Sequence, residues 1–341
     1  MAEQRFLVVR LSSLGDIVHT FPAVAALRET FPNSEIVWLT HPRWKLLVES
    51  SALATQAWAT ETRSVSSLRG ILSRIRERKF SVAIDYQGLW KSAALPLFGG
   101  IPRRVGFSSE TVREYGVPML YTDRVRCTQT HIADQNGELS LHAGARHGCA
   151  AFSLNVSQSD ATTVRDYLQG HGIEHYVALS PGGGWRSKCW PPERFGVLCK
   201  KIREGLRLRC VVNYGPGEEQ LAATIRESSG AADPLLYSGS LGPLMALLRN
   251  VVCIVGGDTG PLHLAVALGT PAVALFGPTD PARNGPYHLD DSAGVPRRDI
   301  ILRSPRAVTS YKRGDQADPS MLEIEVEAVF EAVRRVVEAC A

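Results

Sequence analysis

The chain has 341 residues, of which 44% are hydrophobic and 21% charged, a globular composition that suits two domains of roughly 100–200 residues each. Its net charge of +4 is compatible with an anionic ligand or a membrane surface and too small to indicate nucleic-acid binding. Seven cysteines without a CxxC pair argue against a disulfide framework, and no His/Cys/Asp cluster has metal-ligand spacing.

The N-terminal apolar run is too short for a secretory signal, and no segment reaches the roughly 18 apolar residues of a membrane span. We therefore expect a cytoplasmic protein whose contact with a membrane is peripheral. We expect no metal, no other cofactor and no nucleic-acid partner.

The first half alternates between strand and helix patterns. An apolar run predicts a buried strand at 6–9, and β-branched or apolar runs predict further strands at 35–39, 81–85 and 103–107. Helices are predicted between or after them at 17–31, 66–78 and 131–147, with a turn at 11–16 before the first. This order is typical of a parallel sheet, so we expect a Rossmann-like domain over 1–160.

A second series of the same kind occupies 170–315, after a short predicted helix at 164–170. Strands are predicted at 176–180, 209–213, 251–255 and 272–276, and helices at 192–205, 218–229, 241–250 and 261–268. An amphipathic helix at 323–339 ends the pattern. Ligands of such sheets bind at the carboxyl ends of the strands, so the loops there are the candidate sites.

The segment 256–265 joins a predicted strand to a helix that begins near Pro261. The free N–H groups at a helix N-terminus favour a diphosphate. Asp258 cannot attract phosphate itself; it either accepts a sugar or ribose hydroxyl or caps the helix. His263 is either part of this site or a buried core histidine.

Glycines at 182–184 follow another strand and allow the backbone to approach a ligand closely. Lys188, a few residues later, is either a cation for a leaving diphosphate or a plain surface lysine, and Arg186 has the same potential. After the next strand a carboxylate could take both hydroxyls of a ribose. Spacing alone does not choose between Glu218 and Glu219.

The segment 12–20 in the first half is neither GxGxxG nor a Walker motif, which removes the main support for dinucleotide oxidoreduction and nucleotide hydrolysis. Asp16 is either a general base or a charge that complements a helix N-terminus. Gln87 and Lys91 follow the strand at 81–85 and could hold an acidic acceptor. Basic residues nearby could add to that patch: Arg103, Arg104 and Arg113.

Four segments occur in an order that resembles the heptosyltransferase family, family 9 of the glycosyltransferases: 12–20, 85–94, 258–263 and 276–281. The segment 85–94 is most like the members that add heptose to the Kdo region of lipid A. The resemblance implies a GT-B fold, in which two Rossmann-like domains with parallel sheets face a central cleft. It also implies that the C-terminal helix, 320–341, packs back on the first domain.

The resemblance further implies an inverting, metal-independent transfer from ADP-L-glycero-D-manno-heptose to Kdo-lipid A, at the cytoplasmic face of the inner membrane. Asp16 becomes the catalytic base and Lys188 the partner of the diphosphate. The implied donor-binding residues are Gly183, Gly184, Glu218 (favoured over Glu219), Asp258, Thr259, Gly260 and His263. The implied acceptor-binding residues are Ser12, Ser13, His19, Gln87, Lys91 and Arg113.

Similar enzymes can carry hydroxyl side chains where this chain has Gly183 and Gly184, so backbone N–H groups would have to replace them. Two alternatives stay open: a family member with another acceptor, of the second or third heptosyltransferase type, and a non-catalytic nucleotide-binding protein. A sugar-nucleotide epimerase is a weaker third.

Overall fold

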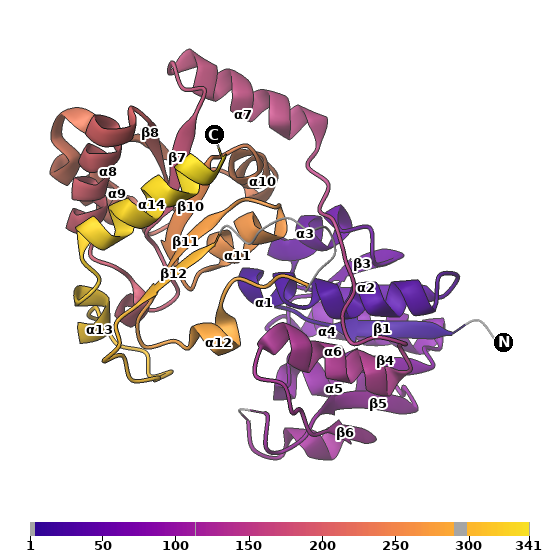
Figure 1. Cartoon of the computed structure of the whole chain (residues 1–341). Coiled ribbons are helices and arrows are strands. Elements are labelled where there is room, and N and C mark those ends of the chain that lie inside the picture. Colours follow the sequence, from indigo (N-terminus) through magenta and orange to yellow (C-terminus); the bar gives the residue numbers. More distant parts are fainter. Residues whose placement is uncertain (1–3, 113, 290–298, 341) are drawn as a thin grey trace. The chain divides into compact units, whose positions relative to one another are not determined.

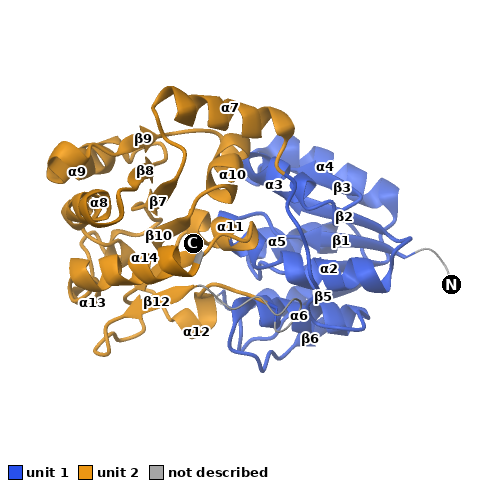
Figure 2. Ribbon diagram, turned by 45° about the horizontal axis from the view of Figure 1, so that its top comes forward, with its two compact units in different colours: residues 1–155, 289–292 blue, residues 156–288, 293–341 orange. Residues whose placement is uncertain are grey.

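The structure, a computed structural model, describes residues 4–112, 114–289 and 299–340. These form two compact units (Figure 2). The first covers residues 4–155 and Leu289, and the second covers the other described residues from Val156 onward. Each unit is a parallel sheet with helices packed on it.

The first sheet has six strands in the order β3-β2-β1-β4-β5-β6, all parallel. This is the doubly wound order of a Rossmann fold, in which the winding direction reverses between β1 and β4. The strands are β1 (Arg5–Val9), β2 (Glu35–Thr40), β3 (Gln56–Ala59), β4 (Val82–Asp85), β5 (Arg103–Phe107) and β6 (Asp123–Val125).

Helices bury both faces of this sheet, which explains why its central strands are apolar without alternation. Leu7 of β1 lies in one core with Ile71 and Ile75 of α4. On the other face Phe21 of α2 packs against Trp38 of β2, with ring centroids 5.4 Å apart. The helices are α1 (Leu14–Val18), α2 (Phe21–Thr30), α3 (Lys45–Ser50), α4 (Val65–Arg78), α5 (Trp90–Phe98) and α6 (Ile132–Ala143).

The single helix expected over 17–31 is two helices, α1 and α2. Pro22 lies in the first turn of α2, where a proline without an N–H is tolerated. Asp16 consequently lies in the first turn of α1 and not in a turn before the helix. The helix expected to reach residue 147 ends at Ala143, because Gly144 adopts a φ of +108°.

The second sheet repeats the first, with the order β12-β11-β10-β7-β8-β9 and a reversal between β7 and β10. Strand β10 begins two residues later than the run at 251–255 predicts and includes Gly256 and Gly257, so Asp258 is the first residue after it. The strands are β7 (Tyr176–Ser180), β8 (Arg209–Asn213), β9 (Leu235–Tyr237), β10 (Cys253–Gly257), β11 (Ala272–Phe276) and β12 (Ile300–Arg303).

The helices of the second unit also cover both sheet faces (Figure 1). The one expected at 164–170 begins earlier, because Ser157 caps its N-terminus and accepts a hydrogen bond from the Asp160 N–H. The helices are α7 (Gln158–Gly170), α8 (Pro192–Leu206), α9 (Glu219–Ser229), α10 (Leu241–Arg249), α11 (Gly260–Ala267), α12 (Pro281–Asn284), α13 (Pro319–Leu322) and α14 (Val326–Cys340).

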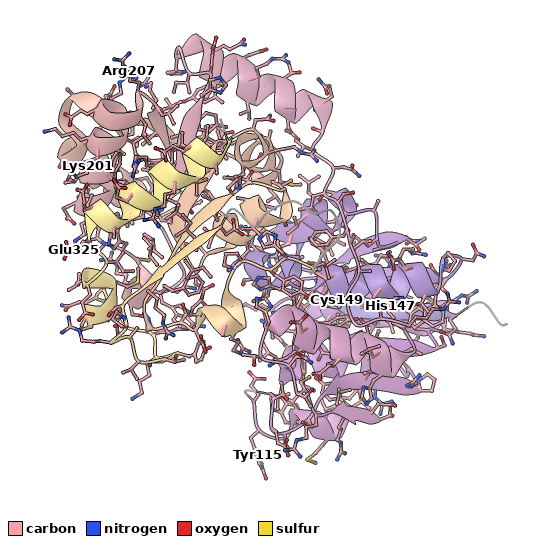
Figure 3. The ribbon with its side chains drawn as sticks, viewed as in Figure 1. Tyr115, His147, Cys149, Lys201, Arg207 and Glu325 are labelled. Carbon is pink, nitrogen blue, oxygen red and sulfur yellow. The ribbon has the colours of Figure 1, made fainter. Side chains whose placement is uncertain are left out.

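The C-terminal helix belongs to the second unit, whereas the resemblance implied that it packs back on the first domain. Val329 and Val333 of α14 are fully buried in the core of the second unit, beside α8 and the strands β10–β12. Lys201 of α8 forms an ion pair with Glu327 of α14, 2.6 Å apart (Figure 3 labels Lys201 beside this helix). The apolar stripe of α14 thus completes the cover of the second sheet.

Candidate functional site

Most of the candidate catalytic and donor-binding residues lie near the point where the winding of their sheet reverses. Each sheet has one such point. In the first sheet β1 and β4 are neighbours, with Val9 opposite Asp85; Asp16 lies in the helix that follows β1, and Gln87 lies in the turn that follows β4. In the second sheet β7 and β10 are neighbours, with Ser180 opposite Gly256. Loops at such switch points form the usual ligand site of open α/β sheets.

In the first unit the carboxylate of Asp16 is held from two sides. Nη2 of Arg10 lies 2.6 Å from Oδ1 of Asp16. The backbone N–H and the hydroxyl of Ser13 donate to Oδ2, at 3.0 and 2.7 Å. The Asp16 side chain is still 40% exposed. It therefore complements the N-terminus of α1 and also stays accessible to a ligand, and its role as a general base stays a prediction.

Arg10 is a functional candidate that the sequence analysis missed. Its side chain is buried, and besides pairing with Asp16 it donates a hydrogen bond to the carbonyl of Tyr86. In the same place the Leu11 N–H donates to Oε1 of Gln87 at 2.7 Å. Two side-chain contacts thus join the loops after β1 and β4. The signal in the sequence was a cation at the end of an apolar strand, six residues before an aspartate.

The turn that carries Gln87 is fixed by Asp85, which is fully buried. Its carboxylate accepts hydrogen bonds from the Tyr121 hydroxyl at 2.7 Å, from the Ser92 hydroxyl at 2.8 Å and from the Gln87 N–H at 2.9 Å. Burial raises the pKa of Asp85, and the hydrogen bonds from Tyr121 and its neighbours offset part of that rise. Asp85 is thus a positioning residue for this turn.

The other residues expected to bind the acceptor differ in how deeply they are buried. Ser12 is half-buried, and Lys91 lies exposed on α5. His19 is buried, with its ring edge-on to His131 at a centroid distance of 5.3 Å. Arg113 lies outside the described residues.

In the second unit Lys188, Asp258 and His263 form one buried cluster. Nζ of Lys188 lies 3.2 Å from Oδ2 of Asp258 and also donates to the Asp258 carbonyl. Nε2 of His263 lies 3.0 Å from Oδ1. Both carboxylate oxygens are therefore engaged by side chains, and the N-cap of α11 is Thr259 instead. Asp258 orients Lys188 and His263, and Lys188 is not a plain surface lysine.

Burial raises the pKa of Asp258, but the hydrogen bond from His263 and the charge of Lys188 outweigh it and lower the pKa to about 2. A carboxyl whose pKa is lowered by folding stabilises the protein above its unfolded pKa, near 3.8, and loses this contribution as the pH falls towards 2.

We therefore expect about 2 kcal/mol of unfolding free energy to be lost at this site between about pH 4 and pH 2. Urea unfolding at several pH values would measure the loss. The Asp258→Asn variant should show a correspondingly shallower decline. An identical decline in both proteins would contradict the assignment.

The glycine turn lies against Glu218 and Thr259. A Cβ on Gly182 would lie 2.0 Å from Oε1 of Glu218, so a larger residue here would displace the Glu218 carboxylate. A Cβ on Gly183 would lie 3.6 Å from Cγ2 of Thr259, while no described atom lies within 4 Å of one placed on Gly184. The turn after β7 thus reaches both the N-terminus of α11 and the loop after β8.

Glu218 and Glu219 differ in their surroundings. Oε2 of Glu218 accepts a hydrogen bond from the Gly215 N–H at 2.8 Å, and the side chain is half-buried beside Gly182. Glu219 is exposed, and its Oε1 lies 3.2 Å from the Gly217 nitrogen. Only Glu218 is therefore adjacent to the glycine turn.

The hydroxyl of Thr259 is buried and unsatisfied. Thr259 is 8% exposed, and its hydroxyl has no hydrogen-bond partner among the residues that the structure describes. Buried hydroxyls normally have a hydrogen-bond partner, so this one indicates that a ligand atom binds at the N-terminus of α11. The adjacent Gly260 begins the helix and leaves its N–H groups open to the same ligand.

The described part of the chain contains no group of three or more His, Cys, Asp or Glu side chains placed to hold a metal ion. It also contains no helix that is both long and apolar enough to cross a membrane.

Solved structures share this fold over almost the whole chain. The glycosyl transferase family 9 protein from Veillonella parvula DSM 2008 matches with a TM-score of 0.82 at 22% identity, covering 98% of each chain. The E. coli heptosyltransferase WaaC with ADP matches with a TM-score of 0.72 at 22% identity, covering 98% of this chain and 100% of that one. The expected GT-B fold class, with two Rossmann-like units, is confirmed.

The sequence comparisons agree. Lipopolysaccharide heptosyltransferase 1 of Escherichia coli (strain K12) is 26% identical over 320 residues, which cover 89% of this chain and 98% of that protein. Lipopolysaccharide heptosyltransferase 2 of the same strain is 24% identical, covering 96% and 97%. Residues 69–296, more than half of the chain, match glycosyltransferase family 9 (heptosyltransferase). The chain therefore belongs to glycosyltransferase family 9, the heptosyltransferases, and is a glycosyltransferase.

Proposed function

We propose that this protein transfers heptose from ADP-L-glycero-D-manno-heptose to the Kdo region of Kdo-lipid A in lipopolysaccharide core synthesis. The transfer inverts the anomeric carbon and needs no metal ion. The observation that carries the proposal is the cluster at the second switch point: Lys188 is bonded to Asp258, and the next residue, Thr259, has an unsatisfied hydroxyl at the N-terminus of α11. The relatives named lipopolysaccharide heptosyltransferase 1 support the coarser part of the proposal, the transfer of heptose in lipopolysaccharide synthesis.

The second unit binds the donor in this proposal. As the sugar–phosphate bond breaks, its electron pair moves to an oxygen of the leaving ADP. Lys188, the Thr259 hydroxyl and the first N–H groups of α11 stabilise that charge, and the backbone of Gly183 and Gly184 approaches the same group. Asp258 holds Lys188 and His263 in position through both carboxylate oxygens. These fixed positive groups do part of the work that a divalent cation does elsewhere.

The first unit supplies the base. Asp16 takes the proton from an acceptor hydroxyl while that oxygen forms a bond to the anomeric carbon, on the face opposite ADP. The guanidinium of Arg10, 2.6 Å from Oδ1, fixes the orientation of the carboxylate. Because attack and departure occur in one step on opposite faces, the configuration inverts.

Glu218→Ala should raise the Kd for ADP about tenfold, whereas Glu219→Ala should change it by less than about twofold. Glu218 is proposed to accept hydrogen bonds from the ribose hydroxyls, and Glu219 is an exposed neighbour with the same charge. Calorimetric titration with ADP and with 2′-deoxy-ADP would test this. The deoxy analogue should bind the wild type more weakly than ADP but bind Glu218→Ala almost as well as ADP. The reverse behaviour of the two glutamates would move the role to Glu219.

The function itself is tested by incubating the protein with ADP-heptose and Kdo-lipid A and analysing the products by mass spectrometry. We expect one heptose on the acceptor and free ADP. Transfer only to an acceptor that already carries heptose would indicate a family member of the second or third type. ADP binding without transfer to any acceptor would indicate a non-catalytic protein, and conversion of the donor alone would indicate an epimerase.

We also propose that the reaction takes place at the cytoplasmic face of the inner membrane, with the protein bound peripherally. Sedimentation with vesicles that contain the lipid acceptor would test this. Equal sedimentation with vesicles that lack it would count against recruitment by the acceptor.

A further inference from the structure

The ring of Trp185 brings together two cations from different loops. Nζ of Lys188 lies 5.1 Å from the ring centroid, and the guanidinium carbon of Arg313 lies 5.7 Å from it. Tyr311 stands edge-on to the same ring, at a centroid distance of 6.5 Å. Arg313 belongs to the loop after β12, which nothing above assigns to the site. Cations held over a tryptophan face in this way are attracted by the ring quadrupole.

The loop that carries Arg313 is bonded on both sides of it. The Ser187 N–H donates to the Gly314 carbonyl at 3.3 Å, and the Asp318 N–H donates to the Ser187 carbonyl at 3.0 Å. The Ser310 N–H donates to the Pro278 carbonyl at 2.7 Å. The loop is thereby fixed to the turn of Lys188 and to the loop after β11, so Arg313 is held at the carboxyl edge of the second sheet.

The charges at this edge show why a second cation matters. Lys188 and Asp258 form an ion pair, so together they carry no net charge. The N-terminus of α11 adds only about half of a positive charge. A leaving diphosphate carries more negative charge than these groups offset. Arg313 is exposed and, within residues 4–112, 114–289 and 299–340, has no acidic group at ion-pair distance, so its charge is not already neutralised.

We propose that Arg313 is a second cation for the diphosphate of the nucleotide sugar, held by the Trp185 ring that Lys188 also contacts. The inference rests on the donor class proposed above. A guanidinium can donate two parallel hydrogen bonds to phosphate oxygens, which an ammonium cannot. Arg313 thus contacts the leaving group and stabilises the electron pair that the diphosphate takes from the broken bond.

The test compares Arg313→Gln with Arg306→Gln. Arg306 is an exposed arginine of the same loop that pairs with Glu323 at 2.8 Å, so both substitutions remove one positive charge. Calorimetric titrations with ADP and AMP give the affinities. We expect Arg313→Gln to weaken ADP about tenfold and AMP by less than about twofold, because AMP lacks the diphosphate. Arg306→Gln should change neither.

Trp185→Leu, which removes the ring that both Arg313 and Lys188 contact, should weaken ADP at least as much as Arg313→Gln does and change AMP little. Unchanged ADP affinity in Arg313→Gln would overturn the inference and leave the proposed function intact. Equal weakening of ADP and AMP would also overturn it, since the charge would then act on the whole nucleotide. A wild type that binds no ADP would overturn both proposals together.

Discussion

Asp16→Asn should lower kcat for sugar transfer by about 10²- to 10⁴-fold while the Kd for ADP stays within about twofold of the wild type. The amide has the shape of the carboxylate but cannot take the acceptor proton. In the proposed mechanism ADP binds to residues of the second unit, so its affinity should not change. Steady-state transfer assays and calorimetric titration with ADP measure the two quantities separately.

The matched control is Glu49→Gln, which removes one negative charge from an exposed ion pair with Lys45 in the same unit. Its turnover should stay close to that of the wild type, because exposed pairs of this kind contribute little. Asp16→Asn also leaves the buried Arg10 without its partner, so urea unfolding must show that the variant is folded under the assay conditions. A folded variant with more than about a tenth of the wild-type turnover would contradict the assignment of the base.

Lys188→Met should lower kcat by about 10²- to 10³-fold and weaken ADP binding, because the leaving diphosphate loses a preorganised cation. It should also lower the free energy of unfolding by roughly 3–5 kcal/mol, since it removes one partner of a buried ion pair. The Asp258 carboxylate would keep only the hydrogen bond from His263.

The double variant Lys188→Met with Asp258→Asn separates these two effects. Without the carboxylate no buried charge is left uncompensated, so much of the stability should return. The transfer rate should stay low, because the cation for the diphosphate is still missing. If the double variant recovered both the transfer rate and the free energy of unfolding, the role of Lys188 would be to neutralise Asp258 and not to stabilise the leaving diphosphate.

The central strands of both sheets were predictable because they are continuous apolar runs that helices bury on both faces. The outer strands were not. Strand β3 has the sequence QAWA and β6 only DRV, and both are partly exposed, so neither shows a run or an alternation that differs from a loop. The spacing in α14 predicted an apolar face correctly. It could not say which sheet that face covers, because a stripe of valines fits either.

The sequence indicated which segments carry the candidate site, but it did not indicate which side chains contact one another. The segments of Asp16, Lys188 and Asp258 all follow predicted strands, and strand ends are where such sheets bind ligands. The pair of Lys188 and Asp258 spans 70 residues of sequence and forms only because β7 and β10 are neighbours in the sheet. The pair of Arg10 and Asp16 is local, yet the arginine resembled an interruption of an apolar run.

The six strands of the first sheet all come from one uninterrupted stretch, residues 5–125, and α14 belongs to the second unit. Exchanging the gene segment for the first unit between relatives would therefore leave each sheet with strands from one parent only. Under the proposed division of labour, recombination near residue 155 would give a hybrid enzyme that keeps its nucleotide sugar and acquires a new lipid substrate. A family built in this way can diversify the carbohydrate it assembles while its activated-sugar supply stays constant.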